Sequence, residues 1–311
     1  MKMTGKKEKN LKKRLIRYIP LYIMALPGLL YLFVNNYMPL PGLVLAFKKY
    51  NAKKGIFGSK NVGFKNFKYL FATKDAFVIT RNTILYNIVF IIVNTLLAVF
   101  VAILLAEMTS KLKRIYQIII LLPFMISMVI VSYLVFGFLS NDNGFINNTI
   151  LSALGKEPIQ WYMQKQYWPF ILVFVNAWKV IGYNCIIYLS AILGIDRSIY
   201  ESASIDGAGK WAQVRKITIP LLRPTIIMMT LLAVGRIFYS DFGLFYQVPQ
   251  NQGALFAVTN TIDTYVYRGL LELGDISMAS AAGLYQSVVG FIFILAANLI
   301  VRKLDPDNAL F

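Results

Sequence analysis

The chain has 311 residues, of which 58% are hydrophobic and 15% charged, with a net charge of +18 and a mean hydropathy of +0.60. A soluble domain carries about a quarter charged residues, so this composition excludes an ordinary water-soluble globule and indicates several membrane spans. Histidine is absent and Cys185 is the one cysteine, which excludes histidine-based catalysis, an internal disulfide, and cysteine or histidine metal sites.

Six apolar runs, each near the length of a membrane-spanning helix, follow one another along the chain. The first, residues 19–34, comes after a segment in which eight of the first 17 residues are lysine or arginine. No clean small-residue cleavage site follows it, so we interpret it as a retained span and not as a signal peptide. The other spans are predicted at residues 82–106, 115–139, 168–193, 224–245 and 278–301. The predicted fold class is an all-α membrane protein with six spans.

The distribution of basic residues predicts the orientation of these spans. An even number of spans places both termini on one side of the membrane. The exposed segments on that side carry 18 lysines and arginines, against 12 on the other side, of which nine lie in residues 35–81. Cytoplasmic segments are enriched in basic residues and the first span usually dominates, so we expect both termini in the cytoplasm. The positive net charge then needs no nucleic acid partner to explain it.

The spans divide the chain into four parts. Residues 1–17 are a basic cytoplasmic segment, either an amphipathic helix held on anionic lipid or a disordered topology signal. Residues 18–81 contain the first span and an extracellular cap, "KKYNAKKGIFGSKNVGFKNFKYLF", whose composition predicts loops and short helices on the membrane surface. Residues 82–301 form the core, with a cytoplasmic loop at 196–220, and residues 302–311 form a cytoplasmic tail.

The loop at 196–220 places charged residues and glycines between two apolar stretches. Its "DGAGKW" has some likeness to a phosphate-binding loop. Such a loop needs a glycine five residues before its Gly-Lys pair and a serine or threonine after the lysine. Those positions hold Ser204 and Trp211. We therefore expect neither a nucleotide site nor a cofactor in this chain.

The same loop predicts two short helices joined by a turn. "DRSIYESASI" has helix-forming residues, with Asp196 or Ser198 as the N-cap and Glu201 at the capping-box spacing from Ser198. Gly207 permits the turn. "KWAQVRKITI" predicts a second helix that ends at Pro220.

The second helix of this loop carries one apolar stripe, because Trp211, Val214 and Ile217 recur at intervals of three residues. A helix pair with such a stripe suits docking in a groove of another protein. It equally suits an amphipathic linker that lies on the lipid surface. The pattern by itself leaves both roles open.

The spacing in the loop resembles the EAA motif of binding-protein-dependent ABC importer permeases, which reads E-A-A, three residues, G, nine residues and I-x-L-P. The matching residues are Glu201, Ala203, Gly207, Ile217 and Pro220, while Ser202 and Ile219 replace the usual alanine and leucine. Stretches such as "LPGLLYLFVNNYMPLPGLVLAFKKYN", "NTIDTYVYRGL" and "GLYQSVVGFIFILAANLIVRKL" extend the likeness over nearly the whole chain. They resemble the oligosaccharide- and polysaccharide-type permeases, in particular the LplB-like group of Gram-positive bacteria.

This resemblance implies the type I ABC importer permease fold and a permease subunit that translocates an oligosaccharide, not an enzyme. It implies three kinds of protein partner. They are a second, homologous permease in a heterodimer, two copies of a cytoplasmic ATPase that bind ATP and magnesium, and an extracellular lipid-anchored binding protein. The implied location is the plasma membrane of a bacterium, with a Gram-positive source suggested by the LplB-like group.

The resemblance also assigns six loop residues to the coupling of ATP hydrolysis with transport. They are Glu201, Ala203, Asp206, Gly207, Ile217 and Pro220. The first four would contact the ATPase, where Glu201 would meet a basic residue. The last two would anchor the second helix at the membrane.

Polar side chains inside the spans are candidates for the substrate path, because a charge at the bilayer centre costs about 2.5–3.5 kcal/mol and usually faces protein or water. A sugar also needs hydrogen-bonding groups and aromatic faces. The candidates are Asn176, Lys179 and Tyr183 on one face of the fourth span, Arg236, Tyr239 and Asp241 in the fifth, and Tyr285 and Gln286 in the sixth. Each has a structural alternative, such as an Arg236–Asp241 pair or a hydrogen bond between helices.

Other functions stay open from the residues alone. Importers of other solutes share the EAA motif, so a peptide or phosphonate permease is the first alternative. A stand-alone channel would leave the loop without a partner. A membrane enzyme is disfavoured because the spans contain no histidine, no cysteine pair and no cluster of acids.

Overall fold

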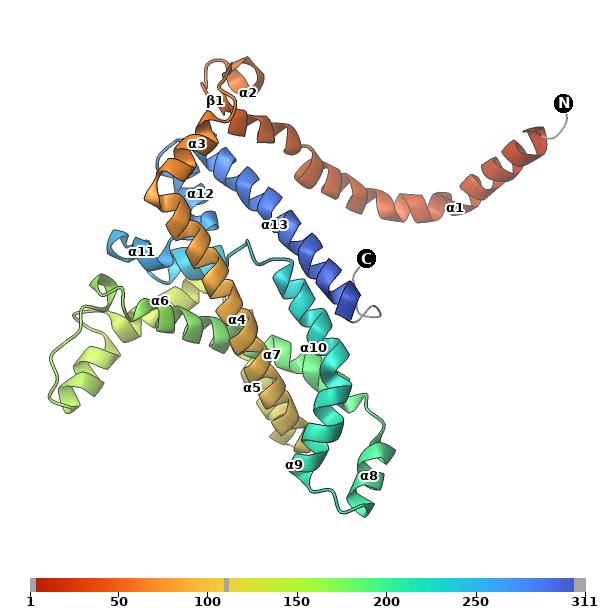
Figure 1. Ribbon diagram of the computed structural model, residues 1–311, viewed down its shortest axis with the longest axis vertical. Helices are drawn as coiled ribbons and strands as arrows, with labels where there is room; N and C mark the ends of the chain where they lie inside the picture. The colour runs from red at the N-terminus through yellow and green to blue at the C-terminus, as the bar shows by residue number, and fades with distance from the viewer. Residues whose placement is uncertain (1–3, 109–111, 305–311) are drawn as a thin grey trace.

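The structure, a computed structural model, describes residues 4–108 and 112–304 and is almost entirely helical (Figure 1). The long helices are α1 (Thr4–Leu32), α4 (Lys74–Glu107), α7 (Trp168–Leu193), α10 (Ile219–Val234) and α13 (Ile276–Leu304). The shorter ones are α2 (Gly55–Gly58), α3 (Lys65–Ala72), α5 (Leu112–Met125), α6 (Met128–Leu139), α8 (Arg197–Ile205), α9 (Lys210–Gln213), α11 (Phe256–Thr259) and α12 (Ile262–Leu271). Short 3₁₀ or π-helical segments occupy Phe33–Tyr37, Leu40–Phe47, Ile146–Leu151, Trp161–Met163, Val214–Thr218, Gly243–Gln247 and Gly253–Leu255.

Five stretches of the described chain are long and apolar enough to cross a membrane, and a bent pair of helices makes a sixth candidate. The predicted all-α, multi-span class is therefore confirmed. The fourth predicted span coincides with α7, while α4 and α13 extend beyond the spans predicted at 82–106 and 278–301. Of the predicted tail, residues 302–304 continue α13, and residues 305–311 lie outside the described part of the chain.

The first span extends away from the other helices (Figure 1). Every residue from Tyr18 to Pro41 is exposed, including the large apolar side chains. The helix begins at Thr4, so the backbone of the basic segment is helical and not disordered. An apolar helix with its side chains exposed over this length fits lipid or another membrane subunit.

α4 and α7 form the centre of the molecule and pack against each other along their length (Figure 1). Ala98 and Ala102 of α4 belong to one fully buried cluster with Cys185 and Tyr188 of α7. Small side chains let membrane helices approach closely, which maximises van der Waals contact where no hydrophobic driving force exists. Cys185 is a buried packing residue in this cluster.

The span predicted at residues 115–139 is broken into α5 and α6, which are bent by 96° relative to each other. Pro123 lies near the end of α5, and the Ser127 hydroxyl then caps α6 by accepting the Ile130 N–H at 3.4 Å. A proline disrupts the hydrogen bonds of the turn before it, and a serine cap starts a new helix. The run is uniformly apolar, so hydropathy alone did not reveal the break.

The span predicted at residues 224–245 is shifted toward the N-terminus. Residues 210–234 form one continuous helical stretch, and the second loop helix therefore does not end at Pro220. Pro220 is the second residue of α10 and follows directly on the π-helical segment Val214–Thr218, so it lies inside the continuous stretch and does not end it. The helix ends at Val234, so Arg236, Tyr239 and Asp241 lie on the connection that follows α10 and not within a span.

The cap contains the predicted short helices together with a two-stranded antiparallel sheet, β1 (Lys48–Lys49) and β2 (Lys60–Asn61). This sheet is a small departure from the all-α prediction. The Tyr50 N–H donates to the Ser277 hydroxyl at 2.8 Å and thereby ties the cap to α13. The cap and the α8–α9 loop lie at opposite ends of the molecule (Figure 1).

Candidate functional site

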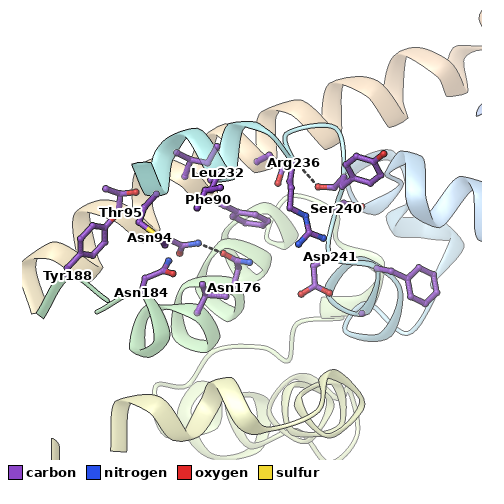
Figure 2. Close-up of a pocket in the computed structure, with 18 residues that line it drawn as sticks. Phe90, Asn94, Thr95, Asn176, Asn184, Tyr188, Leu232, Arg236, Ser240 and Asp241 are labelled. Carbon is purple, nitrogen blue, oxygen red and sulfur yellow. Dashed lines mark hydrogen bonds between the residues drawn. The ribbon is translucent and has the colours of Figure 1, made fainter. Parts of the chain in front are cut away.

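A pocket of about 670 Å³ lies among α4, α7, α10 and the connection after α10 (Figure 2). Its polar lining is Asn87, Asn94 and Thr95 of α4, Asn176, Asn184 and Tyr188 of α7, and Arg236, Tyr239, Ser240 and Asp241 of the connection. Phe90 and Leu232 are among its apolar residues. The pocket thus combines amides, hydroxyls and one charge of each sign with an aromatic surface.

Two asparagines of the pocket lining, one from α4 and one from α7, are hydrogen-bonded to each other. The Asn94 amide donates to Asn176 Oδ1 at 2.8 Å (Figure 2). Asn94 is 9% exposed, and its own Oδ1 has no partner among the described residues. A buried polar atom without a partner costs about 1–3 kcal/mol. Within the described chain, the burial of Asn94 Oδ1 therefore carries a cost that no protein group offsets.

The connection after α10 is held rigidly by hydrogen bonds from neighbouring helices. The Ser240 N–H and hydroxyl both donate to Asp263 Oδ2 at 2.7 Å. The Asn87 amide donates to the carbonyls of Ile237 and Tyr239 at 2.9 and 3.0 Å. Because these bonds fix the backbone, the polar side chains on the connection are preorganised around the pocket.

Arg236 and Asp241 both line the pocket, yet they form no ion pair within the described chain. Asp241 Oδ1 instead accepts the Leu244 N–H at 3.1 Å. The structural alternative of an Arg236–Asp241 pair is therefore wrong. Asn176 and Tyr239 complete the set of predicted pathway residues that the pocket brings together.

The other predicted pathway residues lie outside this pocket. Gln286 of α13 donates to the Phe238 carbonyl and to Asp263 Oδ1, so it stabilises the connection after α10. The Tyr285 hydroxyl lies 3.3 Å from that of Thr80. Tyr183 stacks on Phe124 with ring centroids 4.7 Å apart. These three positions are occupied by contacts within the protein.

The predicted pathway residues include none from α4, although α4 contributes polar side chains to the pocket. Asn87 and Asn94 are seven residues apart, two full turns, within an otherwise apolar helix. Asn184 on α7 follows Asn176 by eight residues and lines the same pocket. The signal was available in the spacing of asparagines, but only the packing of α4 on α7 aligns the two rows.

Lys179 lies at the break between α5 and α6. Its ammonium donates to the carbonyls of Pro123 and Phe124 at 3.3 Å each, and also to that of Ile126. The last carbonyls of a helix lack intrahelical partners and carry partial negative charge, which a cation stabilises. Lys179 therefore stabilises the broken end of α5 and does not neutralise an acid.

Replacing Lys179 with methionine is expected to lower the free energy of unfolding by about 2 kcal/mol, because charged hydrogen bonds contribute about 1.5–3 kcal/mol. Thermal unfolding of the purified protein in detergent measures this change. Lys165→Met, which removes an exposed lysine near the start of α7, is the matched control. An equal midpoint for both variants would show that the carbonyl cluster needs no cation.

The loop at 196–220 begins with α8, whose N-cap is Asp196. Its carboxylate accepts the Ser198 N–H at 2.9 Å, so Asp196 and not Ser198 caps the helix. This bond holds the pKa of Asp196 below its usual value. Gly207 has a φ of +80° and its N–H donates to the Ser204 carbonyl, while the Ala208 N–H donates to that of Ala203. This pair of bonds is a Schellman motif, which ends α8.

The loop presents its remaining predicted residues in different environments. Glu201 is exposed, with its Oε1 3.8 Å from Nε of Arg197. Asp206 is exposed at the end of α8. Ile217 is half-buried and Pro220 is exposed. The predicted apolar stripe is divided, because Val214 is buried whereas Trp211 is 75% exposed.

Apolar side chains accumulate on the surface of this loop. Ile205 is 87% exposed and Trp211 75% exposed, beside the charges of Glu201 and Asp206. Gln213 donates to the Ser204 hydroxyl at 2.8 Å and to the Ala208 carbonyl at 3.0 Å, so α8 and α9 form one unit. Exposed large apolar residues on a braced helix pair are typical of a protein-docking surface.

An ion pair connects this loop to the helix that lines the pocket. Lys210 Nζ lies 2.7 Å from Oε2 of Glu107, the last residue of α4. Each charge lies at the helix end that its sign disfavours, since Glu107 ends α4 and Lys210 begins α9. Pairing across the two helices offsets that cost. The loop and the pocket therefore share α4.

Comparison with known proteins gives consistent matches. A family model described as "Binding-protein-dependent transport system inner membrane component" matches residues 76–306. Protein LplB of Bacillus subtilis (strain 168) is 34% identical over 289 residues, covering 93% of this chain and 90% of that protein. The polygalacturonan/rhamnogalacturonan transport system permease protein YteP of the same organism is 33% identical over 303 residues, covering 97% and 94%. A solved bacterial ABC transporter involved in the import of the acidic polysaccharide alginate has a TM-score of 0.86 at 31% identity, covering 95% and 99%.

Proposed function

The chain belongs to the family of binding-protein-dependent transport system inner membrane components, the permease subunits of ABC importers, and from this membership we propose that it translocates an oligosaccharide. The pocket among α4, α7 and the connection after α10 is the proposed passage. The observation that carries the proposal is the row of amides that α4 and α7 present to the pocket, Asn87, Asn94, Asn176 and Asn184. Sugar hydroxyls both donate and accept hydrogen bonds, so they satisfy amides of either orientation.

The relatives support a carbohydrate substrate. YteP is a polygalacturonan/rhamnogalacturonan permease, and the similar solved transporter imports alginate. The unpaired guanidinium of Arg236 and the Phe90 ring in the pocket suit a hydrophilic ring molecule with polar substituents. A fragment of a polysaccharide, delivered by an extracellular binding protein, is the substrate that we propose.

The proposed assembly contains this chain, a second homologous permease, and two copies of a cytoplasmic ATPase that bind ATP and magnesium. The α8–α9 loop faces the ATPase through Glu201, Ala203, Asp206 and Gly207, and both termini lie in the cytoplasm. Closure of the ATPase dimer moves the loop, and the Lys210–Glu107 pair transmits the movement to α4. Transport then follows from contacts that differ between two states of the assembly.

The double variant Asn94→Ala with Asn176→Ala is expected to raise the KM of uptake by roughly 5- to 150-fold, since two lost hydrogen bonds to substrate contribute about 1–3 kcal/mol together. Removing both partners avoids leaving one of the pair buried and unsatisfied. Uptake of labelled oligosaccharides by the transporter in proteoliposomes, with its binding protein and ATP, measures the effect.

Ser190→Ala serves as the control for this uptake measurement, because Ser190 lies on α7 outside the pocket and bonds only its own helix. If the double variant has the same KM as the wild type, the pocket is not part of the substrate passage. Failure of the wild-type assembly to take up any oligosaccharide, with uptake of a peptide or phosphonate instead, would overturn the proposed substrate class.

A further inference from the structure

A second groove, of about 690 Å³, lies between α4 and α7. Its apolar lining includes Leu85, Val89, Val93 and Leu97 of α4 and Phe170, Val173, Phe174 and Ala177 of α7. Leu85 and Asn87 are two residues apart, which places them about 200° apart around the helix. The groove and the pocket therefore lie on different sides of α4, and the groove is separate from the proposed passage.

Arg81 lies at one end of this groove and has free hydrogen-bond donors. Its Nε and Nη2 donate to Asn82 Oδ1 at 3.3 and 2.9 Å, and Nη2 also donates to the Ala257 carbonyl at 3.0 Å. Within the described chain, Nη1 has no hydrogen bond and the guanidinium has no carboxylate partner. The two N–H groups of Nη1, out of the five that an arginine carries, can therefore donate to an anion.

The dimensions of the groove correspond to one leaflet of a membrane. Leu85 and Leu97 are twelve residues apart on α4, a rise of about 18 Å. Half of the hydrocarbon core of a bilayer is about 15 Å thick. Arg81 lies one turn beyond Leu85, at the level of the start of α7, where the half-buried Tyr167 lies. Aromatic residues of this kind concentrate at the membrane–water interface.

We propose that this groove binds an anionic phospholipid, with an acyl chain along α4 and α7 and the phosphate on Nη1 of Arg81. The apolar length of the groove and the single guanidinium at its interfacial end match the two parts of such a lipid. Phe170 and Phe174, which are 78% and 70% exposed, form the outer wall of the groove.

The test uses the membrane complex as purified through a tag on this chain, in nanodiscs of equal amounts of phosphatidylglycerol and phosphatidylcholine. Each lipid in turn carries a photoreactive acyl chain, and labelled peptides are mapped. Phosphatidylglycerol should label α4 and α7 about five times more strongly than phosphatidylcholine, the preference expected of one basic residue near an anionic surface. Arg81→Gln should abolish the preference and leave phosphatidylcholine labelling unchanged.

Lys74→Gln is the matched control, because it removes one positive charge from the same end of α4 outside the groove. It should keep the preference. Equal labelling of the wild type by both lipids would overturn the proposal. So would a photoreactive side chain at position 89 that cross-links to another protein chain. If Arg81→Gln does not fold, the wild-type protein is labelled in the presence of each unlabelled lipid in turn. Stronger competition by phosphatidylglycerol than by phosphatidylcholine supports the proposal, and equal competition overturns it. None of these readouts depends on transport or ATP.

Discussion

Replacing Gly182 with alanine should destabilise the protein by about 3 kcal/mol or more and separate α5 from α7. A Cβ atom at Gly182 would lie 1.8 Å from the Ile120 carbonyl oxygen and 2.4 Å from its carbon. These are backbone atoms, so no side-chain rotation relieves the contact. Overpacking typically costs about 1–3 kcal/mol, and a clash between two backbones belongs at the upper end or above. Lys179 lies one turn away on the same helix, so its bonds to the end of α5 would be strained as well.

The measurement for Gly182→Ala is the thermal unfolding midpoint of the purified protein, together with the yield of monodisperse material. Gly283→Ala is the matched control, because Gly283 is also helical, on α13, and a Cβ there meets no atom within 4 Å. The control should unfold like the wild type. If both variants are equally stable, the close approach of α5 and α7 is not required by the fold.

Replacing Gly207 with valine should disconnect the α8–α9 loop from its proposed ATPase partner. Gly207 has a φ of +80°, where a side chain costs about 1–2 kcal/mol and a β-branched one is a genuine outlier. The Schellman bonds from Gly207 and Ala208 would be lost, so α8 would end differently and Glu201 would be redirected. A cost of this size lowers the ratio of the native loop conformation to its alternatives by roughly 5- to 30-fold.

Co-purification of the ATPase and uptake should therefore both fall in Gly207→Val, while the unfolding midpoint of the spans changes little. Gly209→Ala is the control, because Gly209 has a φ of −67° and open space around its Cβ position. Full co-purification and uptake in Gly207→Val would mean that the loop geometry does not carry the coupling. Loss of both in Gly209→Ala would point to a general sensitivity of the segment.

The membrane-spanning architecture of this protein was predictable because it depends on local composition. An apolar run of sufficient length has to bury its backbone polar groups in a helix, whatever surrounds it. The run at 168–193 therefore coincides with α7, and the loop at 196–220 was recognised by charges and glycines that are contiguous in the chain. Short-range rules predicted the turn at Gly207 and left Asp196 and Ser198 as alternatives for the N-cap, of which the structure shows Asp196.

The break between α5 and α6 has a local cause in Pro123 and the Ser127 cap, but contacts between segments distant in sequence hold both this break and the connection after α10 in place. Lys179 supplies the cation for carbonyls more than fifty residues earlier, and Asp263 holds Ser240 from a different helix. Asn87 likewise bonds the connection after α10, 150 residues away. Composition and periodicity determine which residues enter the membrane and become helical. Only tertiary packing determines which polar side chains of these helices face a shared pocket, because that depends on partners that the local sequence does not contain.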